Sequence, residues 1–428
     1  MRDVVLLDGF RTPFAKAGTA LARVSARELG RVAVSELLAR QGIDPQDVDD
    51  VIVGNVAGPS DSQNIARVVA LLAGIPLHVP AVTVHRNCAS GMESIAQAYE
   101  RVASGQADLV VAGGTESMSG IPLYMSHGMT RIFERAMRAR SPLQRAGAFA
   151  AVRPRDLAPR IALVEGLTDP VSGLNMGETA EVLAREFGIS REAQDDFALQ
   201  SHRRAIAAQE AGRLREEIVP VFAPPYREVV AEDVGPRKGQ SLEALAKLRP
   251  YFNPRTGTVT PGNACPITDG AAAILVASAD KARSLGLLPA GRIRGYAFVG
   301  LDPAHMGLGP THATPVALRR ARARLSDIGL IEMNEAFAAQ VIANEIAMGS
   351  ASYAREKLGL DSPVGDIDRS ILNVNGGAIA MGHPVGVSGT RLVLTLLREM
   401  RRRDVPLGLA TLCVGGGQGA AFVLERAT

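Results

Sequence analysis

Cysteine is scarce in this sequence, aromatic residues are few and tryptophan is absent. The three cysteines, Cys88, Cys265 and Cys413, lie far apart, and no CxxC or Cys/His spacing accompanies them. So few cysteines in a chain of 428 residues form no disulfide framework, and their spacing indicates no zinc site. We therefore expect reduced thiols, each of them either a small core residue or a nucleophile.

The sequence also lacks a long unbroken apolar run. Glycine and proline interrupt the longest apolar stretches, such as 405–424, whereas a membrane-spanning helix needs about 20 apolar residues in succession. Residues 1–8 enter a strand-like run at once, without the basic and apolar regions of a signal peptide. These features predict a cytoplasmic protein.

Charge of one sign is not in excess either, since the net charge is +3, and this gives no case for nucleic-acid binding. Segment 120–164 is the exception, with eight arginines against the acids Glu134 and Asp156. A core cannot bury so many unpaired guanidinium groups. We therefore expect an external basic face for a partner subunit or an anionic membrane surface. Its arginines are Arg131, Arg135, Arg138, Arg140, Arg145, Arg153, Arg155 and Arg160.

Predicted helices and strands alternate near both ends of the chain, which is typical of an α/β protein. The two ends follow a similar plan, which indicates an internal duplication. The region between them is richer in charge and proline, and we interpret it as an insertion that shapes a substrate site. The predicted helices cover 26–41, 90–104, 177–188, 313–324 and 388–402, and the predicted strands 51–56, 81–84, 108–112, 328–333, 370–375 and 407–412.

The segment Asn87-Cys88-Ala-Ser-Gly-Met-Glu93 lies where a predicted strand gives way to a helix. The free amides and partial positive charge of a helix N-terminus favour a thiolate over a thiol. Small residues after Cys88 let a substrate approach the sulfur closely. Cys88 is therefore a candidate nucleophile.

Three further segments carry candidate catalytic groups. His383 lies in a glycine-rich turn before a helix, where an imidazole can project into a site as general base or oxyanion donor. Cys413 ends a predicted strand, and the glycines after it leave backbone amides free to face a developing oxyanion. That loop could equally cradle a phosphate, although it matches neither GxGxxG nor a P-loop. Asn334 follows the strand 328–333, where a site role competes with that of a turn residue.

In order and spacing these four segments resemble the thiolase family, and so do Arg11-Thr-Pro-Phe14, Gly257-Thr-Val-Thr-Pro-Gly-Asn-Ala264 and Met306-Gly-Leu-Gly-Pro310. The resemblance covers the chain from end to end. It implies a thiolase fold of two duplicated βαβαβαββ halves in five layers, with an inserted loop domain. The implied divisions are 1–119 and 256–283 for the N-terminal half, 120–255 for the inserted loop domain and 284–428 for the C-terminal half.

By the same resemblance, Cys88 becomes acylated, His383 activates it and Cys413 exchanges a proton with the substrate α-carbon or the leaving coenzyme A. Asn334 holds a water that forms one oxyanion hole with His383. The amides of Cys88 and Gly415 form the second oxyanion hole. Met176, Cys265, Met306 and Phe337 line the acyl and pantetheine region, and Cys265 stands where the family commonly has a small hydroxyl residue.

The activity implied is reversible cleavage of 3-ketoacyl-CoA by coenzyme A, in fatty-acid β-oxidation. Coenzyme A is a substrate, and neither a cofactor nor a metal is expected. We expect a homodimer or tetramer. Segment 247–252 resembles thiolase subunits of trifunctional fatty-acid-oxidation complexes, which have a hydratase/dehydrogenase partner subunit, although those subunits often carry His at the position of Asn334.

Three alternatives stay open. A biosynthetic acetoacetyl-CoA thiolase has the same chemistry in reverse. A ketoacyl synthase has the duplicated fold and an acylated cysteine, but it usually completes its site with His/His or His/Asn rather than a second cysteine. A non-catalytic binding module predicts the loss of at least one of Cys88, Asn334, His383 and Cys413, and all four are present.

Overall fold

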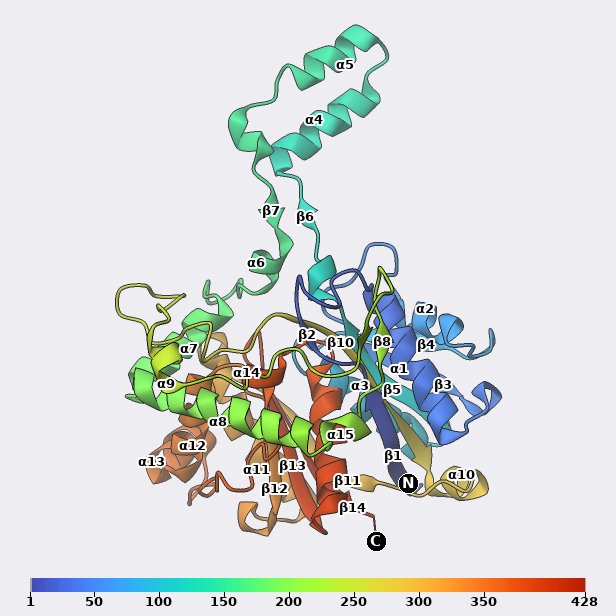
Figure 1. The fold of residues 1–428 in the computed structure, drawn as a ribbon, viewed down its shortest axis with the longest axis vertical. Coiled ribbons are helices and arrows are strands. Elements are labelled where there is room, and N and C mark those ends of the chain that lie inside the picture. The colour runs from blue at the N-terminus through green and yellow to red at the C-terminus, as the bar shows by residue number, and fades with distance from the viewer. Residues whose placement is uncertain (1, 428) are drawn as a thin grey trace.

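The computed structural model describes residues 2–427 and consists of a layered α/β body with one long protruding arm (Figure 1). Ten strands form its main sheet. Nearly continuous Val, Leu, Ile and Ala in the central strands explain their burial on both faces, as is usual where helices cover both sides of a sheet. Within residues 2–427 no helix is both long enough and apolar enough to cross a membrane.

The N-terminal half of the sheet has the order β4-β3-β5-β10-β1. The first three strands are parallel, and β10 pairs antiparallel with both β5 and β1. The strands are β1 (Val4–Arg11), β2 (Ala15–Lys16), β3 (Asp50–Gly54), β4 (Ala81–Val84), β5 (Leu109–Glu116) and β10 (Thr268–Ser278). The short β2 pairs with the start of β10.

The C-terminal half repeats this plan. Strand β12 (Leu330–Met333) is parallel to β13 (Leu407–Val414), and β14 (Gln418–Arg426) is antiparallel to both β13 and β11 (Gly291–Gly300). Within residues 2–427, the strand pairing that joins the two halves of the sheet is that of Leu6 with Gly291, in β1 and β11. The predicted duplication is therefore visible in the strand directions.

Helices form three layers around the two half-sheets, which makes the five layers that were expected (Figure 1). The outer layer on the N-terminal half holds α1 (Ala26–Gln41) and α2 (Ile65–Leu72). The central layer holds α3 (Ser90–Ala103) and α15 (Ser388–Arg402), and the outer layer on the C-terminal half holds α11 (Gly309–Ala321) and α12 (Ala338–Gly349). In the central layer, Ile95 and Leu396 share one apolar cluster with Ile274 and Phe422 of the two half-sheets.

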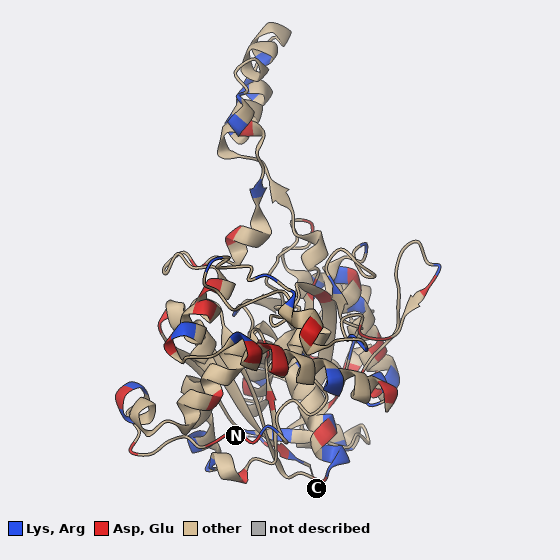
Figure 2. Ribbon diagram, turned by 60° about the vertical axis from the view of Figure 1, so that its left-hand side comes forward, with Lys and Arg blue, Asp and Glu red and all other residues tan. Residues whose placement is uncertain are grey.

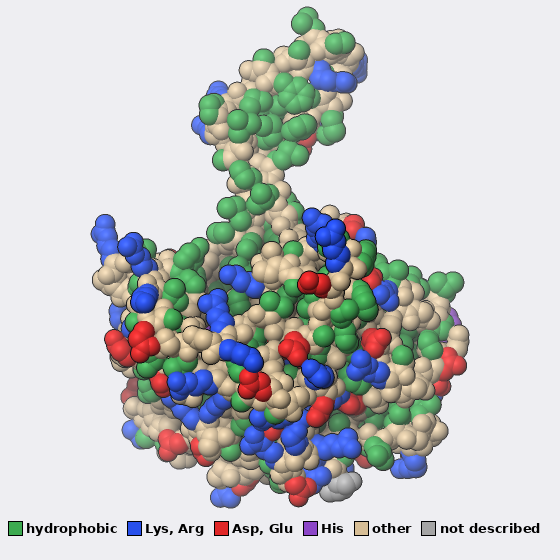
Figure 3. Space-filling view, viewed as in Figure 1, with side chains coloured by type: hydrophobic (Ala, Val, Ile, Leu, Met, Phe, Trp, Pro, Cys, Tyr) green, Lys and Arg blue, Asp and Glu red, His purple; other side chains and the backbone are tan. Residues whose placement is uncertain are grey.

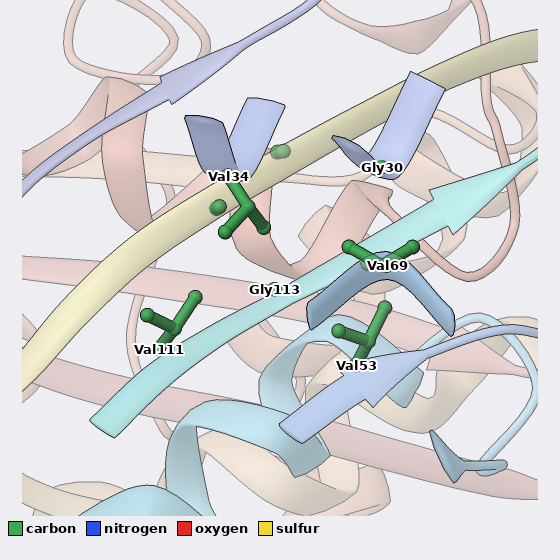
Figure 4. A pocket seen from close by; sticks show the side chains of 9 residues that line it. Gly30, Val34, Val53, Val69, Val111 and Gly113 are labelled. Carbon is green, nitrogen blue, oxygen red and sulfur yellow. The ribbon is translucent and has the colours of Figure 1, made fainter. Parts of the chain in front are cut away.

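Helix α1 shows how the sequence favours these elements. Its N-cap Ser25 accepts a hydrogen bond from the Glu28 amide, and Gly42 ends the helix in the left-handed conformation. Gly30 allows α1 to approach β5, since a Cβ there would lie 3.3 Å from the Thr115 side chain. A cavity of about 10 Å³ beside Gly30 is lined only by glycine, alanine and valine (Figure 4). It is too small and too apolar to be a ligand site.

The segment expected as an insertion lies outside the main sheet. Its first part is the arm, defined here as residues 121–166, in which α4 and α5 pack on each other through the edge-to-face pair Phe133 and Phe149. Its second part packs on both halves: Leu183 and Phe197 join the apolar core of the C-terminal half, and Val221 joins that of the N-terminal half. The elements are β6 (Leu123–Tyr124), α4 (His127–Arg138), α5 (Pro142–Phe149), β7 (Arg160–Ile161), α6 (Ala162–Gly166), α7 (Met176–Glu186), α8 (Arg191–Glu210), β8 (Val221–Phe222), β9 (Val229–Val230) and α9 (Leu242–Ala246). The proposed domain boundaries themselves stay a prediction.

The remaining short helices are α10 (Ala279–Ser284), α13 (Ala351–Tyr353) and α14 (Ala378–Met381). Most expected elements are present with shifted ends, but the predicted strand 370–375 is wrong. Only Leu372 forms a bridge there, to Ile331 of β12. Asn373 has a left-handed φ of 45° and turns the chain away, while its side chain bonds the backbone of Met333. The segment is therefore an irregular counterpart of β4.

Candidate active site

Cys88 lies in the short loop between β4 and α3, as expected, and is half-buried. The helix N-termini of α3 and α15 meet beside it. This contact requires glycine on both helices, since a Cβ on Gly91 would lie 2.6 Å from the Thr390 amide nitrogen and one on Gly389 would lie 2.5 Å from the Met92 amide nitrogen. The two halves of the chain therefore join at the start of the helix that follows Cys88.

The Cys88 thiol has a higher pKa than an ordinary cysteine. Burial raises it, and hydrogen bonds from the Gly415 and Cys88 amides lower it by less. The amides thus act in the direction that the helix N-terminus predicts. The expectation of a favoured thiolate is nevertheless wrong for the resting site, because desolvation disfavours the charged sulfur more strongly than the amides favour it. Cys88 therefore needs a base to remove its proton.

His383 is an imidazole with one free ring nitrogen. Its Nδ1 lies 2.5 Å from Ser388 Oγ, and Ser388 Oγ lies 3.2 Å from the Pro384 carbonyl oxygen. Only one arrangement of hydrogens satisfies both contacts: Nδ1–H donates to Ser388, whose hydroxyl donates to Pro384. Nε2 then carries the lone pair, and this buried nitrogen has no protein partner. Burial, together with the charge of Arg391, lowers the pKa of His383 to about 4, so the imidazole is neutral near pH 7.

The turn that follows His383 is fastened to the N-terminal half-sheet. Glu116, at the end of β5, accepts hydrogen bonds from Gly386 at 2.9 Å and from the amides of Val56 and Ala57. The turn packs directly on β5, since a Cβ on Gly114 would lie 2.1 Å from the Gly386 carbonyl oxygen. Burial raises the pKa of Glu116 to about 7 against these hydrogen bonds. A side chain of one half thus holds the histidine turn of the other.

Cys413 is the second-last residue of β13, at the strand end where it was predicted. The turn 415–417 joins it to β14, and Gly309 packs against it, since a Cβ there would lie 3.1 Å from Cys413 Cα. Burial raises the Cys413 pKa well above its ordinary value, and the neighbouring Cys88 and Cys265 add to the rise. Cys413 is therefore a protonated thiol that can donate a proton.

Asn334 follows β12 directly and is fully buried. Its backbone amide bonds the Thr411 carbonyl of β13, two residues before Cys413. Both side-chain atoms, Oδ1 and Nδ2, lack a protein partner. Buried amides are nearly always hydrogen-bonded, so a side chain with two free polar atoms is suited to hold water or a polar substrate atom.

The expected binding residues occupy different places. Met176 begins α7 with its sulfur 3.3 Å from where a Cβ on Gly415 would be. Cys265 bonds the Ala336 carbonyl through its amide, and burial, with a smaller effect of Cys88, raises its pKa to about 12. Phe337 stacks edge-on against Phe252. Met306, in the 3₁₀ segment Pro303–Leu308, is buried in the same apolar cluster as Cys413 and Phe337.

Sequence reasoning missed several supporting residues. Ser388 and Glu116 received no role, although both lie next to segments that had been singled out. A buried ion pair between Arg391 and Glu332, 2.5 Å apart, links α15 to the strand that precedes Asn334. The only sign of this ion pair in the sequence is that Glu332 is a charged residue inside a predicted strand and Arg391 a charged residue on an apolar helix face. Residues 2–427 contain no cluster of three or more His, Cys, Asp or Glu side chains that could hold a metal ion.

Comparisons with known proteins agree with this arrangement. Residues 4–280 match the family model "Thiolase, N-terminal domain", and residues 287–426 match "Thiolase, C-terminal domain". The chain is 44% identical to the 3-ketoacyl-CoA thiolases of Yersinia pestis (strain Pestoides F) and Yersinia pseudotuberculosis (strain YPIII), over 99% of this chain and 96% of theirs.

Solved structures agree as well. The Bacillus anthracis acetyl-CoA acetyltransferase has a TM-score of 0.86 at 36% identity, with 100% of this chain and 99% of that one covered. Human mitochondrial 3-ketoacyl-CoA thiolase has a TM-score of 0.87 at 37% identity with the same coverage, and its complex with CoA has 0.86 at 37% identity, with 100% and 98% covered. The chain, with its paired half-sheets and the cysteine and histidine turns between them, belongs to the thiolase family.

Proposed function

We propose that this protein cleaves 3-ketoacyl-CoA thiolytically with coenzyme A, through an acyl group on Cys88, and yields acetyl-CoA and a shortened acyl-CoA. The observation that carries the proposal is that two protonated thiols, Cys88 and Cys413, lie near one another and near Cys265, while neutral His383, with a free Nε2, bonds Pro266 next to Cys265. Covalent catalysis and proton transfer to carbon then fall to separate groups. The names of the relatives support the substrate class.

In the first half-reaction the Cys88 sulfur attacks the 3-keto carbon, and its proton passes to His383 Nε2. The bond between C2 and C3 then breaks. Cys413 donates its proton to C2, so acetyl-CoA leaves and Cys413 becomes a thiolate. The rate depends on stabilising the oxyanion at C3, for which preorganised donors such as the Cys88 and Gly415 amides are suited.

In the second half-reaction coenzyme A gives its thiol proton to Cys413, and its sulfur attacks the acyl group on Cys88. The tetrahedral species collapses, and Cys88 recovers its proton from His383. All three groups return to their starting protonation states. Asn334 and His383 supply the other oxyanion site: the free side chain of Asn334 can bind a water, and His383 Nε2 can donate to the thioester oxygen while it holds the proton of Cys88. The scheme needs neither a cofactor nor a metal.

Thiolysis should be measured with 3-ketoacyl-CoA chains from four to sixteen carbons, with the acyl-CoA products separated by chromatography. We expect turnover that requires coenzyme A and a preference for chains longer than four carbons. Activity confined to the four-carbon substrate would favour the acetoacetyl-CoA thiolase instead. A preparation that bound these thioesters without cleaving any of them would contradict the proposal and favour a binding module.

We also propose that the enzyme is a homodimer or tetramer. Strand β4 is an open edge, since it pairs with β3 alone. Leu71, Leu72 and Leu77 nearby in the chain are exposed. An unpaired strand beside exposed leucines is suited to pairing with another copy. Within a cell we expect the cytoplasm as its compartment.

The arm supports a further proposal, that it contacts an anionic membrane surface. Arg160 pairs with Glu165. The other seven arginines of segment 120–164 form no ion pair within residues 2–427. Bulky apolar side chains are exposed on the same arm (Figure 3), whereas acids are few there (Figure 2). This combination is typical of segments that lie at a membrane interface. The exposed apolar residues are Leu123, Tyr124, Met125, Phe133, Met137, Leu143, Phe149, Leu157, Ile161 and Val164.

Replacing Arg131, Arg135, Arg138 and Arg140 by Gln should weaken binding to anionic vesicles on the order of 10³-fold, since each basic residue near such a surface contributes about 1 kcal/mol. The KM for coenzyme A should stay the same, because these residues lie on the arm, away from the body that holds Cys88 (Figure 1). Vesicle cosedimentation and steady-state kinetics measure the two effects.

The matched control for the arm replaces Arg227, Arg319, Arg355 and Arg401, four exposed arginines of the body, by Gln. A second variant, Met137→Ser with Leu143→Ser, removes apolar surface only and should also reduce vesicle binding.

Unchanged vesicle binding of the arginine variant with a sharply raised KM for coenzyme A would place the arginines in the substrate site. Failure of the wild-type enzyme to bind anionic vesicles would favour a partner subunit as the surface that the arm contacts.

A further inference from the structure

Asn87 joins the two catalytic segments that come from opposite halves of the chain. Its side-chain Nδ2 donates a hydrogen bond of 2.7 Å to the Gly415 carbonyl oxygen, 328 residues away in the sequence. Gly415 is buried in the turn after Cys413, and Asn87 immediately precedes Cys88. One side chain thus touches the turn of the second thiol from the residue next to the first.

The backbone of Asn87 is also unusual, since its φ of 43° lies in the left-handed region. Few residues other than glycine adopt this conformation, and asparagine is among those that tolerate it best. The turn brings the Asn87 carbonyl onto the Ser90 amide at 3.0 Å and onto Ser90 Oγ at 2.7 Å. Strained backbone at such a place persists because its surroundings hold it. Asparagine is therefore suited to this position by its backbone as well as by its side chain.

The position of Gly415 matters because hydrogen bonding by its amide lowers the pKa of Cys88 against the effect of burial. Asn87 and Met176 flank this glycine, since a Cβ on it would lie 3.8 Å from Asn87 Nδ2 and 3.3 Å from the Met176 sulfur. The turn contains three glycines in succession and would be mobile without such contacts. An oxyanion donor works only when it is held at hydrogen-bond distance from the developing charge.

We propose that Asn87 is a positioning residue, which holds the Gly415 turn against the nucleophile loop and thereby places the Gly415 amide in the oxyanion hole. The proposal rests on the proposed thiolase function. Asn87 touches neither substrate nor reacting atoms in this account. It acts through the Gly415 peptide and should therefore affect the transition state more than the ground state.

The test uses Asn87→Gly and Asn87→Asp in the full-length enzyme. Glycine keeps the left-handed backbone and removes the donor, and aspartate keeps the shape but places an acceptor against the Gly415 carbonyl. We expect each variant to lower kcat about 10- to 100-fold, with the KM for 3-ketoacyl-CoA within about threefold of wild type. The Gln418→Ala variant is the control, because it removes the Arg86–Gln418 hydrogen bond between the same two segments without touching Gly415. Its kcat should stay within about threefold of wild type.

A second readout is the pH dependence of Cys88 alkylation by iodoacetamide. If Asn87→Gly moves the Gly415 amide away from the Cys88 sulfur, the pKa of Cys88 should rise and the alkylation profile should shift to higher pH. If the Asn87 contact is purely structural, the profile should not shift. Full activity and an unshifted profile in Asn87→Gly would overturn the proposal. Wild-type enzyme that fails to cleave any 3-ketoacyl-CoA would instead overturn the proposed function, so the two failures can be distinguished.

Discussion

Replacing Cys88 by Ser is expected to lower the rate of thiolysis on the order of 10⁴-fold or more, the largest effect that we expect from any single substitution. A serine hydroxyl is far more difficult to deprotonate than a thiol, and a neutral His383 with a pKa of about 4 is too weak a base to ionise it. In the wild-type enzyme, incubation with an acyl-CoA should add one acyl group per chain, on Cys88.

Peptide mapping by mass spectrometry locates the acyl group, and circular dichroism verifies that Cys88→Ser is folded. The mapping is informative because Cys265 and Cys413 lie near Cys88 and offer alternative thiols. Burial raises the pKa of both thiols, and neither receives the hydrogen bond from the Gly415 amide that lowers the pKa of Cys88, so neither should be labelled. Acyl groups found on Cys413 or Cys265 instead would reverse the roles assigned to the thiols.

Replacing Cys413 by Ser should reduce thiolysis and condensation on the order of 10³-fold, while acylation of Cys88 stays detectable. The reason is that Cys413 supplies the proton for carbon, whereas the nucleophile, His383 and the Gly415 amide remain in place. Steady-state rates in both directions and the mass of the acylated protein measure the two consequences.

The alternative chemistry makes a different prediction for the same position. A ketoacyl synthase needs no second cysteine, so a Cys413→Ala protein that still condensed a malonyl thioester would favour that class. Loss of Cys88 acylation in a folded Cys413→Ser protein would contradict the division of labour. It would mean that Cys413 takes part in activating the nucleophile.

Much of the candidate site could be predicted from the sequence, because its catalytic groups lie at the ends of predicted strands or before predicted helices. Cys88 precedes an amphipathic helix, Asn334 follows a buried strand and Cys413 ends another. The thiolase resemblance adds their roles, which nothing local in the chain indicates. The low pKa expected for Cys88 was wrong, since a helix N-terminus is visible in the sequence and burial is not.

The residues that hold the site together could not be predicted from the sequence in this way. Glu116 bonds Gly386, and Asn87 bonds Gly415, across sequence separations of 270 and 328 residues. Neither hydrophobic periodicity nor the spacing of motifs indicates such pairs. The segment around Leu372 was predicted as a strand because its side-chain pattern is strand-like. Its tertiary contacts, which the pattern does not indicate, restrict its strand pairing to one bridge.

What the sequence by itself determined is therefore local: which segments become helices and strands, where they are capped, and which of them carry a thiol or an imidazole at an end. These properties depend on side-chain periodicity and on residues within a few positions of one another. The tertiary structure alone decided the protonation of Cys88 and His383 and the direction in which Nε2 is free. Desolvation and long-range hydrogen bonds set these properties, and both exist only after the two halves have packed together.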